Sequence, residues 1–246
     1  MARGELRVGT SGYQYDHWKG VFYPDDLAKD RWFEHYAGHF DTVEINNTFY
    51  NLPESSTFDA WHDRAPNGFR YVLKYSRYGT HMKKLKDPEG PLNMFLERAE
   101  RLKSFLGPVL VQLPPNWGCN PDRLDAFLTA APKRHRWSIE LRDASWLCEE
   151  VYAILRNHGA ALCIHDMIHD HPEEITADWT YLRFHGPQHT RKYQSEYPYQ
   201  TLQGVAERIR GYLDDGKDVY AYFNNDQHGY AVENAKQLRE YASGVT

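Results

Sequence analysis

Residues 137–165 read WSIELRDASWLCEEVYAILRNHGAALCIH and contain one complete strand–helix–strand unit. Residues rich in β-formers predict strands at Trp137–Arg142 and Ala160–His165, and the amphipathic segment Ser145–Asn157 between them predicts a helix. Gly159 stands where a helix ends and turns into the next strand. Units of this kind place their strands side by side in a parallel sheet. The stretch therefore predicts an α/β protein.

The same unit repeats along the whole chain. Six further strands are predicted at Leu6–Thr10, Thr42–Asn46, Arg70–Lys74, Val109–Leu113, Trp179–His185 and Val219–Asn224. Six further helices are predicted at Arg31–Phe40, Ser56–Arg64, Leu92–Phe105, Pro121–Ala130, Leu202–Leu213 and Ala231–Tyr241. The connection Asp166–Asp178 is too short and too polar to predict an eighth helix, so that unit is expected to be abbreviated. We predict a single (β/α)8 barrel of the TIM type, one domain over residues 1–246, since such barrels need roughly 250 residues.

Composition is that of a folded protein of enzyme size. Hydrophobic residues make up 41% and charged residues 26% of the chain, which excludes a disordered or low-complexity protein. No apolar run approaches the roughly 18 residues of a membrane span. The start of the sequence, Met1–Glu5, lacks the apolar stretch of a signal peptide. We therefore expect a cytoplasmic protein with no membrane partner.

Neither a metal nor an organic cofactor is expected. Cys119, Cys148 and Cys163 are odd in number, far apart in sequence and in no C-x-x-C pair, so they indicate neither a disulfide framework nor a thiolate zinc site. The run His165–His171 invites a metal interpretation but fits no strong ligand spacing, and a solvated, His-rich loop is favoured. No glycine-rich dinucleotide loop stands in a convincing context, so a redox cofactor is not expected.

Polar side chains gather where the predicted strands end. Residues two apart on a strand share one face, and near the end of a barrel strand both can point toward the central mouth. The residues in such positions are Glu44, Asn46, Lys74, Gln112, Glu140, Arg142, Arg183, His185 and Asn224. The barrel interior itself is filled by apolar side chains and needs no charge, whereas active sites of these barrels lie at the carboxyl ends of the strands. The set predicts an active site there.

The two carboxylates of this set admit two interpretations. Glu44 and Glu140 could serve as acid and base, with neighbouring cations setting their proton affinities apart. Alternatively Glu44, Glu140, Arg142 and Arg183 form mutually compensating ion pairs that pin the end of the barrel. For the set as a whole we favour the functional interpretation, because its members occupy the carboxyl face.

Two further members have open roles. Lys74 could contact a phosphate, act as an amine nucleophile or pair with a carboxylate, and the ion-pair role is favoured. His185, two residues after Arg183, could transfer a proton or contact an oxyanion, or it could only orient a neighbour.

Positive charge is concentrated on two segments that we expect to border the mouth. Residues 70–86 contain six Lys or Arg and no acid, and residues 181–193 contain three and no acid, in a chain of net charge −5. Interleaved tyrosines could stack on bases while the cations hold phosphates. Ordinary solvated loops are the alternative. We expect binding of a phosphorylated or nucleic-acid ligand to weaken when four cations are neutralised together: Lys83, Lys84, Arg191 and Lys192.

A pattern over nearly the whole chain resembles the YecE-like family, domain of unknown function 72. It consists of Gly9–Tyr13, Trp18–Pro24, Glu44–Tyr50, Lys74, Thr80-His81, Val111–Pro115, Glu140–Arg142, Trp146, Arg183–Gly186 and Phe223–Asp226. The resemblance implies a barrel of the triose-phosphate-isomerase type with a polar cleft formed by these residues. It thereby adds Tyr50, His81 and Asp226 to the candidate substrate-binding residues. It implies no particular reaction.

The leading hypothesis is an enzyme acting on a phosphate-containing or otherwise anionic substrate, with a nucleic acid or nucleotide as the first class to test and hydrolase or lyase chemistry. Its acid and base would be the two glutamates named above, its anion-binding groups Lys74, Arg142, Arg183 and His185, and its orienting groups Asn46, Gln112 and Asn224. The alternative is a non-catalytic barrel that binds an anionic metabolite or a protein partner. The loop 187–200 is expected to set specificity.

Overall fold

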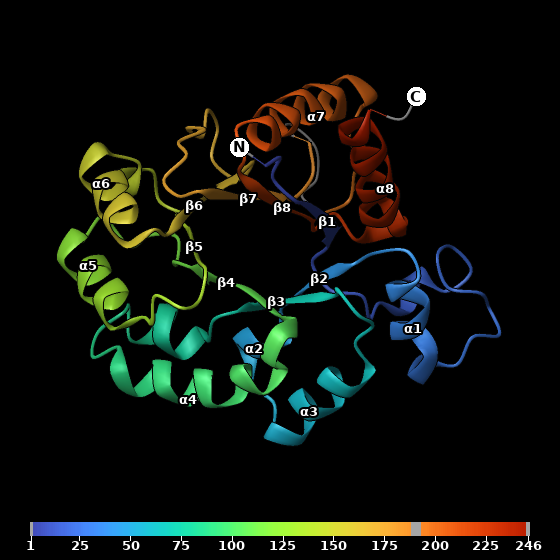
Figure 1. Ribbon diagram of the computed structural model, residues 1–246, viewed down its shortest axis with the longest axis horizontal. Helices are drawn as coiled ribbons and strands as arrows, with labels where there is room; N and C mark the ends of the chain where they lie inside the picture. The colour runs from blue at the N-terminus through green and yellow to red at the C-terminus, as the bar shows by residue number, and fades with distance from the viewer. Residues whose placement is uncertain (1, 188–192, 245–246) are drawn as a thin grey trace. The chain divides into compact units, whose positions relative to one another are not determined.

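The computed structural model describes residues 2–187 and 193–244, and Figure 1 shows their helices and strands. The strands form one sheet in the order β1-β8-β7-β6-β5-β4-β3-β2. They are β1 Leu6–Thr10, β2 Thr42–Ile45, β3 Arg70–Lys74, β4 Leu106–Gln112, β5 Trp137–Glu140, β6 Ala161–His165, β7 Trp179–Phe184 and β8 Asp218–Phe223. A parallel bridge between Ser11 and Glu44 joins the segment after β1 to β2. The predicted (β/α)8 barrel fold is confirmed.

Helices alternate with the strands. They are α1 Trp32–Ala37, α2 Asn47–Tyr50, α3 Ser55–Arg64, α4 Glu89–Ala99, α5 Pro121–Ala130, α6 Glu149–His158, α7 Tyr199–Asp214 and α8 Tyr230–Ser243. Residues 166–178, between β6 and β7, form turns and irregular backbone. The abbreviated unit predicted at this place is therefore confirmed.

Two predicted helices have clearly different bounds in the structure, and one short helix was missed. The helix expected over Leu92–Phe105 begins earlier and ends at Ala99, and a 3-10 segment over Glu100–Phe105 follows, in which Lys103 has a φ of +50°. The helix expected from Ser145 begins at Glu149, because Asp143 instead caps a short 3-10 turn at Ala144–Trp146. The short α2 was missed, since four residues show no helical period.

Local sequence explains where the units start and stop. Strand β4 carries Val109, Leu110 and Val111, all fully buried, as expected for a parallel strand covered on both faces. Helix α5 begins after Asn120, whose side chain accepts the backbone N–H of Arg123 and so satisfies one free helix donor. Helix α6 ends at Gly159, whose φ of +64° is the left-handed conformation that suits glycine.

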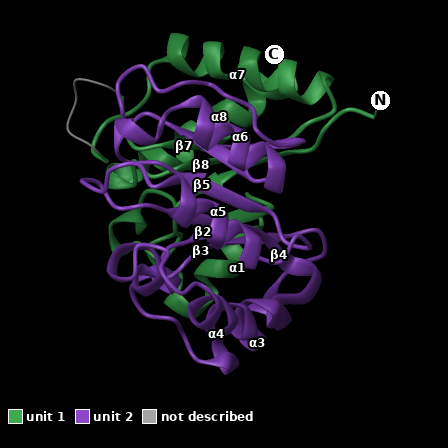
Figure 2. Cartoon of the chain, turned by 90° about the vertical axis from the view of Figure 1, so that its left-hand side faces the viewer, with its two compact units in different colours: residues 1–44, 182–246 green, residues 45–181 purple. Residues whose placement is uncertain are grey.

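The chain divides into two compact units, coloured separately in Figure 2. Unit 1 consists of residues up to 44 and from 182 onward. In it β1 pairs in parallel with β8, from Leu6 opposite Val219 to Thr10 opposite Phe223. Helices α7 and α8 belong to this unit and bury Leu202, Ile209 and Leu238, among other apolar residues. The unit thus has an apolar core of its own.

Unit 2 consists of residues 45–181. Its strands β3 to β6 pair in parallel in chain order and are connected by helices α4, α5 and α6, while α2 and α3 precede β3. The register places Gln112, the last residue of β4, directly opposite Glu140, the last residue of β5. This register positions two of the predicted polar side chains side by side.

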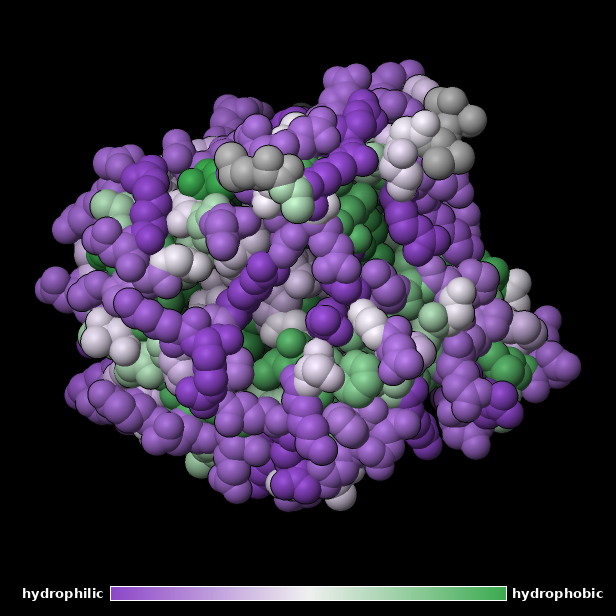
Figure 3. All heavy atoms as spheres, in the orientation of Figure 1, coloured by the Kyte–Doolittle hydropathy of each residue, from purple (hydrophilic) through white to green (hydrophobic). Residues whose placement is uncertain are grey.

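No helix within residues 2–187 and 193–244 combines the length and the apolar character needed to cross a membrane. The face seen in Figure 3 is covered mainly by hydrophilic residues, with only small apolar patches. Large exposed apolar side chains are scattered, for example Val21, Met82 and Met94. Such single residues are ordinary on a protein surface.

Candidate functional site

A buried ion pair lies at the carboxyl ends of two strands of unit 1. Glu44 comes from β2 and Arg183 from β7, and their exposed fractions are 0% and 1%. Arg183 Nη2 donates a hydrogen bond to Glu44 Oε1 over 2.7 Å. Its Nη1 also donates to His185 Nε2 over 3.3 Å. Because that nitrogen accepts, His185 is a neutral imidazole that carries its proton on Nδ1.

The loop after β1 adds groups to this cluster. The hydroxyl of Tyr15 donates to the carbonyl of Ser11 over 2.5 Å. Burial, followed by the carboxylates of Asp226 and Glu44, raises the pKa of Tyr15 well above its ordinary value. The phenol therefore stays protonated at neutral pH. The sequence analysis missed Tyr15, although its place just after a strand end could have indicated it.

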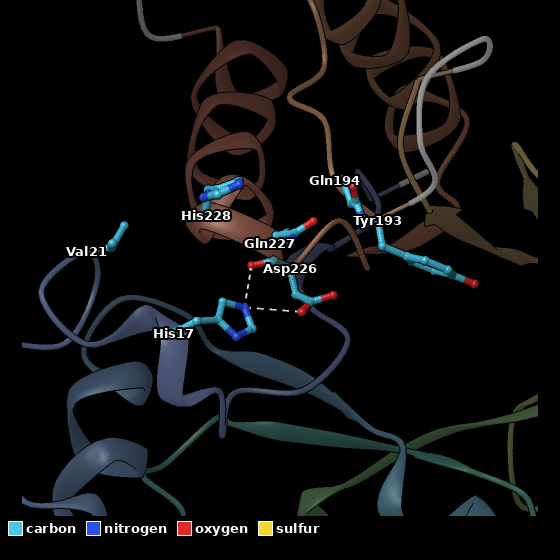
Figure 4. A pocket seen from close by; sticks show the side chains of 7 residues that line it. All are labelled: His17, Val21, Tyr193, Gln194, Asp226, Gln227 and His228. Carbon is cyan, nitrogen blue, oxygen red and sulfur yellow. Dashed lines mark hydrogen bonds and ion pairs between the residues drawn. The ribbon is translucent and has the colours of Figure 1, made fainter.

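Asp226, a predicted substrate-binding residue, is held by the same loop. His17 Nε2 lies 2.9 Å from its backbone oxygen and 3.3 Å from Oδ2, as the dashed lines in Figure 4 show. Trp18 Nε1 donates to the same backbone oxygen over 2.8 Å. Burial raises the pKa of the Asp226 carboxyl. Asp226 is thus a half-buried acceptor whose position is fixed by its contacts with His17 and Trp18.

A small pocket opens beside this acceptor in unit 1. Its lining, drawn in Figure 4, consists of His17, Val21, Tyr193, Gln194, Asp226, Gln227 and His228. Tyr193 connects it to the buried cluster, since its ring centroid lies 5.9 Å from that of His185. Asn224, another predicted residue, is half-buried, and its backbone N–H donates to the carbonyl of Phe184 over 2.7 Å.

Unit 2 holds a second carboxylate at a strand end. Glu140, with an exposed fraction of 0%, accepts two hydrogen bonds on Oε1. Gln112 Nε2 donates one over 2.8 Å, and Arg142 Nη1 donates the other over 2.8 Å. The side chain of Arg142 is 16% exposed. One end of this group therefore reaches the surface while the carboxylate stays buried.

Lys74, at the end of β3, belongs to the same unit. It is 6% exposed, and its Nζ lies 4.3 Å from the ring centroid of Phe49 in a cation–π contact. The ring of Phe49 meets that of His81 edge to face, with centroids 5.0 Å apart. The hydroxyl of Thr48 donates to the backbone oxygen of Lys74 over 2.7 Å. Helix α2 thus packs on the end of β3 and supports the ammonium group.

His81 is a neutral imidazole in this setting. Burial, then Lys74, Arg77 and Arg142, lowers its pKa to about 4, against a smaller opposite effect of Glu140. The hydroxyl of its neighbour in sequence, Thr80, donates to a backbone carbonyl over 3.0 Å and lies 2.9 Å from His81 Nδ1. Since that hydroxyl proton is used, Nδ1–H donates to the hydroxyl, and Nε2 of His81 is left as an acceptor.

Two remaining candidates lie at the two ends of α2. Asn46 stands just after β2, not within it as predicted, and its Oδ1 is buried without a hydrogen-bond partner among the described residues. Tyr50 is 74% exposed and packs edge to face on Phe49. An unsatisfied buried acceptor costs about 1–3 kcal/mol, which a ligand or water donor would recover.

The structure therefore brings the predicted residues together in two clusters. The unit 1 cluster contains Glu44, Arg183 and His185, and the unit 2 cluster contains Lys74, His81, Gln112, Glu140 and Arg142. That all of them border one pocket stays a prediction. Lys83, expected to contact phosphate, lies 3.3 Å from Asp87 as an ion pair. Arg191 and Lys192 lie outside the described residues.

A family model described as "Protein of unknown function DUF72" matches residues 7–245. The chain belongs to the DUF72 family. This family assignment agrees with the resemblance seen in motifs along nearly the whole sequence. It concerns nearly the whole chain, so both clusters lie within the matched region.

Named relatives and solved DUF72 structures agree with the assignment. The UPF0759 protein YunF of Bacillus subtilis is 25% identical over 96% of this chain and 94% of its own. The UPF0759 protein YecE of Escherichia coli is 31% identical over 44% of this chain and 40% of its own. A DUF72 protein from Thermotoga maritima is 28% identical, with a TM-score of 0.87 over 97% of this chain and 99% of its own. One from Enterococcus faecalis, 22% identical with a TM-score of 0.79 over the whole of both chains, shares the fold.

The His-rich stretch of this DUF72 chain begins with His165 at the end of β6, as predicted, and continues as a partly exposed loop over residues 166–171. His165 is 4% exposed, its Nε2–H donates to the carbonyl of Leu141 over 2.7 Å, and its Nδ1 accepts the N–H of Met167 over 3.1 Å. Both ring nitrogens are thus used by backbone, while His169 is exposed. Among residues 2–187 and 193–244, no three His, Cys, Asp or Glu side chains are grouped to hold a metal ion.

Proposed function

We propose that this DUF72 protein is an enzyme acting on a phosphate-bearing substrate, with the substrate anion bound by the unit 2 cluster. The observation that carries the proposal is the charge around His81. Three cations, Lys74, Arg77 and Arg142, and one carboxylate, Glu140, act on its imidazole. This excess of positive charge at the carboxyl ends of parallel strands favours an anionic ligand.

Each member of the cluster suits a distinct role toward such a substrate. Arg142 can hold two phosphate oxygens at once with its planar guanidinium, and Lys74 supplies a point charge. Glu140 is the candidate acid or base, and Gln112 fixes its orientation through the 2.8 Å hydrogen bond. His81 offers a neutral acceptor for a substrate hydroxyl. Hydrolase or lyase chemistry needs no group beyond these, and a nucleotide or nucleic acid is the first class to test.

Binding is tested with inorganic phosphate, ribose 5-phosphate, nucleotides and a single-stranded oligonucleotide, by calorimetry at low and at moderate salt. We expect Lys74→Gln to weaken the tightest of these by roughly tenfold or more, since a hydrogen bond to a charged group contributes about 1.5–3 kcal/mol. The matched control is Lys133→Gln, which removes an exposed cation before β5. Equal affinities in the wild type and both variants would refute the anion site.

Turnover separates an enzyme from a binding barrel. With the ligands that bind, we expect Glu140→Gln to retain affinity within a few-fold while product formation falls by about 10²–10⁴-fold, the usual contribution of a general acid or base. Wild-type protein that binds phosphate ligands but forms no product from any of them would favour the non-catalytic alternative. Folding of each variant is checked by its thermal midpoint.

A further inference from the structure

The segments that follow β4 and β5 are fastened to each other in unit 2. The rings of Trp117 and Trp146 meet edge to face with centroids 4.9 Å apart. Trp146 Nε1 donates to the carbonyl of Trp117 over 2.5 Å, and the backbone N–H of Cys119 donates to the hydroxyl of Ser145 over 3.0 Å. Both tryptophans are buried. Residues 117–119 are therefore held against residues 145–146.

This packing brings together two thiols that the sequence analysis treated as unrelated. The side chains of Cys119 and Cys148 interact with each other, and both residues are partly accessible. Burial, and then Cys148, raises the pKa of the Cys119 thiol to about 11. Cys119 therefore stays protonated at neutral pH. The third cysteine, Cys163, is buried in β6.

We propose that Cys119 and Cys148 are an oxidation site that forms a reversible disulfide. The inference stands apart from the proposed function, because it needs no substrate. The fastened loops bring the two cysteine side chains into contact, and the partial exposure of both residues admits a small oxidant. The sequence alone did not indicate this pair, because Cys119 and Cys148 are far apart in the chain. They come together only because the loops after β4 and β5 are neighbours in the fold.

The reaction balances with hydrogen peroxide as the oxidant. The thiolate sulfur of Cys148 attacks one peroxide oxygen, the O–O bond breaks, and Cys148 becomes a sulfenic acid while the released hydroxide takes up a proton as water. The sulfur of Cys119 then attacks the Cys148 sulfur, the S–S bond forms, and the departing hydroxide leaves with the thiol proton as a second water. Two thiols are oxidised and one peroxide is reduced.

The disulfide would tie together the loops that flank the unit 2 cluster. These loops directly follow Gln112 and Glu140, which are joined by a 2.8 Å hydrogen bond. Closing a loop of this length restricts the unfolded chain, so we expect the oxidised protein to melt about 5–10 °C higher than the reduced one. A thiol reductant should return the melting temperature to its original value.

The test treats dilute, reduced full-length protein with hydrogen peroxide and counts free thiols under denaturing conditions. We expect the count to fall from three to one per chain, with no dimer on a non-reducing gel. Peptide mapping should link the peptide containing Cys119 to the one containing Cys148, and dithiothreitol should restore all three thiols. Cys163→Ala, the matched control, should form the same link.

Single variants make the outcome decisive. Cys119→Ser and Cys148→Ser should each fail to form any intramolecular link and should show no rise in melting temperature after peroxide. The proposal is overturned if wild-type protein keeps three thiols, or if its cysteines oxidise individually without a link between Cys119 and Cys148. Because thiol counts need no ligand, failure here is distinguishable from failure of the anion site.

Discussion

Glu44–Arg183 in unit 1 and Glu140–Arg142 in unit 2 are the same chemical pair in two environments. Both carboxylates are fully buried at strand ends, and the pairs have bond lengths of 2.7 Å and 2.8 Å. The side chain of Arg183 is 1% exposed, whereas that of Arg142 is 16% exposed. Solvent, and hence a ligand, can therefore reach the arginine of the unit 2 pair but not that of the unit 1 pair.

The surroundings separate the pairs further. In unit 1 the arginine also donates to His185, which must be neutral to accept this hydrogen bond. In unit 2 the pair acts on His81 together with two further cations, Lys74 and Arg77. Under the proposed function, the neutral, closed pair is a structural element that holds β2 to β7, and the cationic, partly open pair is the binding element. The predictions below test this division.

The largest expected effect is on folding stability, in unit 1. Glu44→Gln leaves the charge of Arg183 buried without its carboxylate, and breaking a buried ion pair in this way costs about 3–5 kcal/mol. We expect chemical denaturation to show a loss of that size. Glu140→Gln is the matched comparison and should cost clearly less, because Arg142 can turn toward solvent. Equal losses in the two variants would contradict the division.

The second effect is on anion affinity, in unit 2. We expect Arg142→Gln to weaken phosphate binding by roughly 10–100-fold, because an ionic hydrogen bond contributes about 1.5–3 kcal/mol. Arg142→Lys keeps the charge but loses the planar fork, so an intermediate loss is expected. Calorimetric titration with inorganic phosphate measures both. If the two substitutions were indistinguishable from wild type, Arg142 would have no contact with the ligand.

The sequence predicted the carboxyl ends of the strands to within one or two residues, because a parallel strand buried on both faces is a short apolar run. Four candidate site residues predicted within strands lie just after them: Asn46, Arg142, His185 and Asn224. Glu44, Arg183, Gln112 and Glu140 were found from these strand ends, and the register of β4 on β5 explains why two of them touch. Contacts made by loops carry no such pattern. Tyr15 was missed for this reason.

Side-chain environment could not be predicted from the sequence either. Nothing in a sequence distinguishes an arginine that is 1% exposed from one that is 16% exposed, since the difference arises from what covers each strand end. The sequence placed His165 at the end of its strand but did not indicate that backbone groups of Leu141 and Met167 occupy both of its ring nitrogens. The sequence shows where the histidines are, but the atoms that contact their ring nitrogens depend on the packing of the folded chain.

A third, smaller effect is a pH dependence of stability that comes from unit 2. The pKa of His81 is lowered from 6.5 to about 4, so between these values the unfolded chain binds a proton that the folded chain does not. Stability therefore rises with pH across this window and is lost as pH falls through it. His81→Gln should remove this part of the slope in denaturation midpoints measured from pH 6.5 down to 4. His169→Gln, which changes an exposed histidine, should leave the slope unchanged.

The smallest effect belongs to Asp226 of unit 1 and has the opposite sign. Burial raises the pKa of this carboxyl above 3.8, so the folded chain binds its proton more tightly than the unfolded chain, and stability is lost as pH rises through the raised pKa. Asp226→Asn removes this pH-dependent loss of stability, but it also removes the ion pair with His17. The net change in the free energy of unfolding at neutral pH should therefore stay within about 1 kcal/mol. From pH 3.8 upward, denaturation midpoints should rise more steeply with pH in Asp226→Asn than in wild type, while exposed Asp26→Asn should match wild type. A slope in Asp226→Asn equal to that of wild type would show that Asp226 makes no such contribution, and would leave the contrast between the units resting on the two ion pairs.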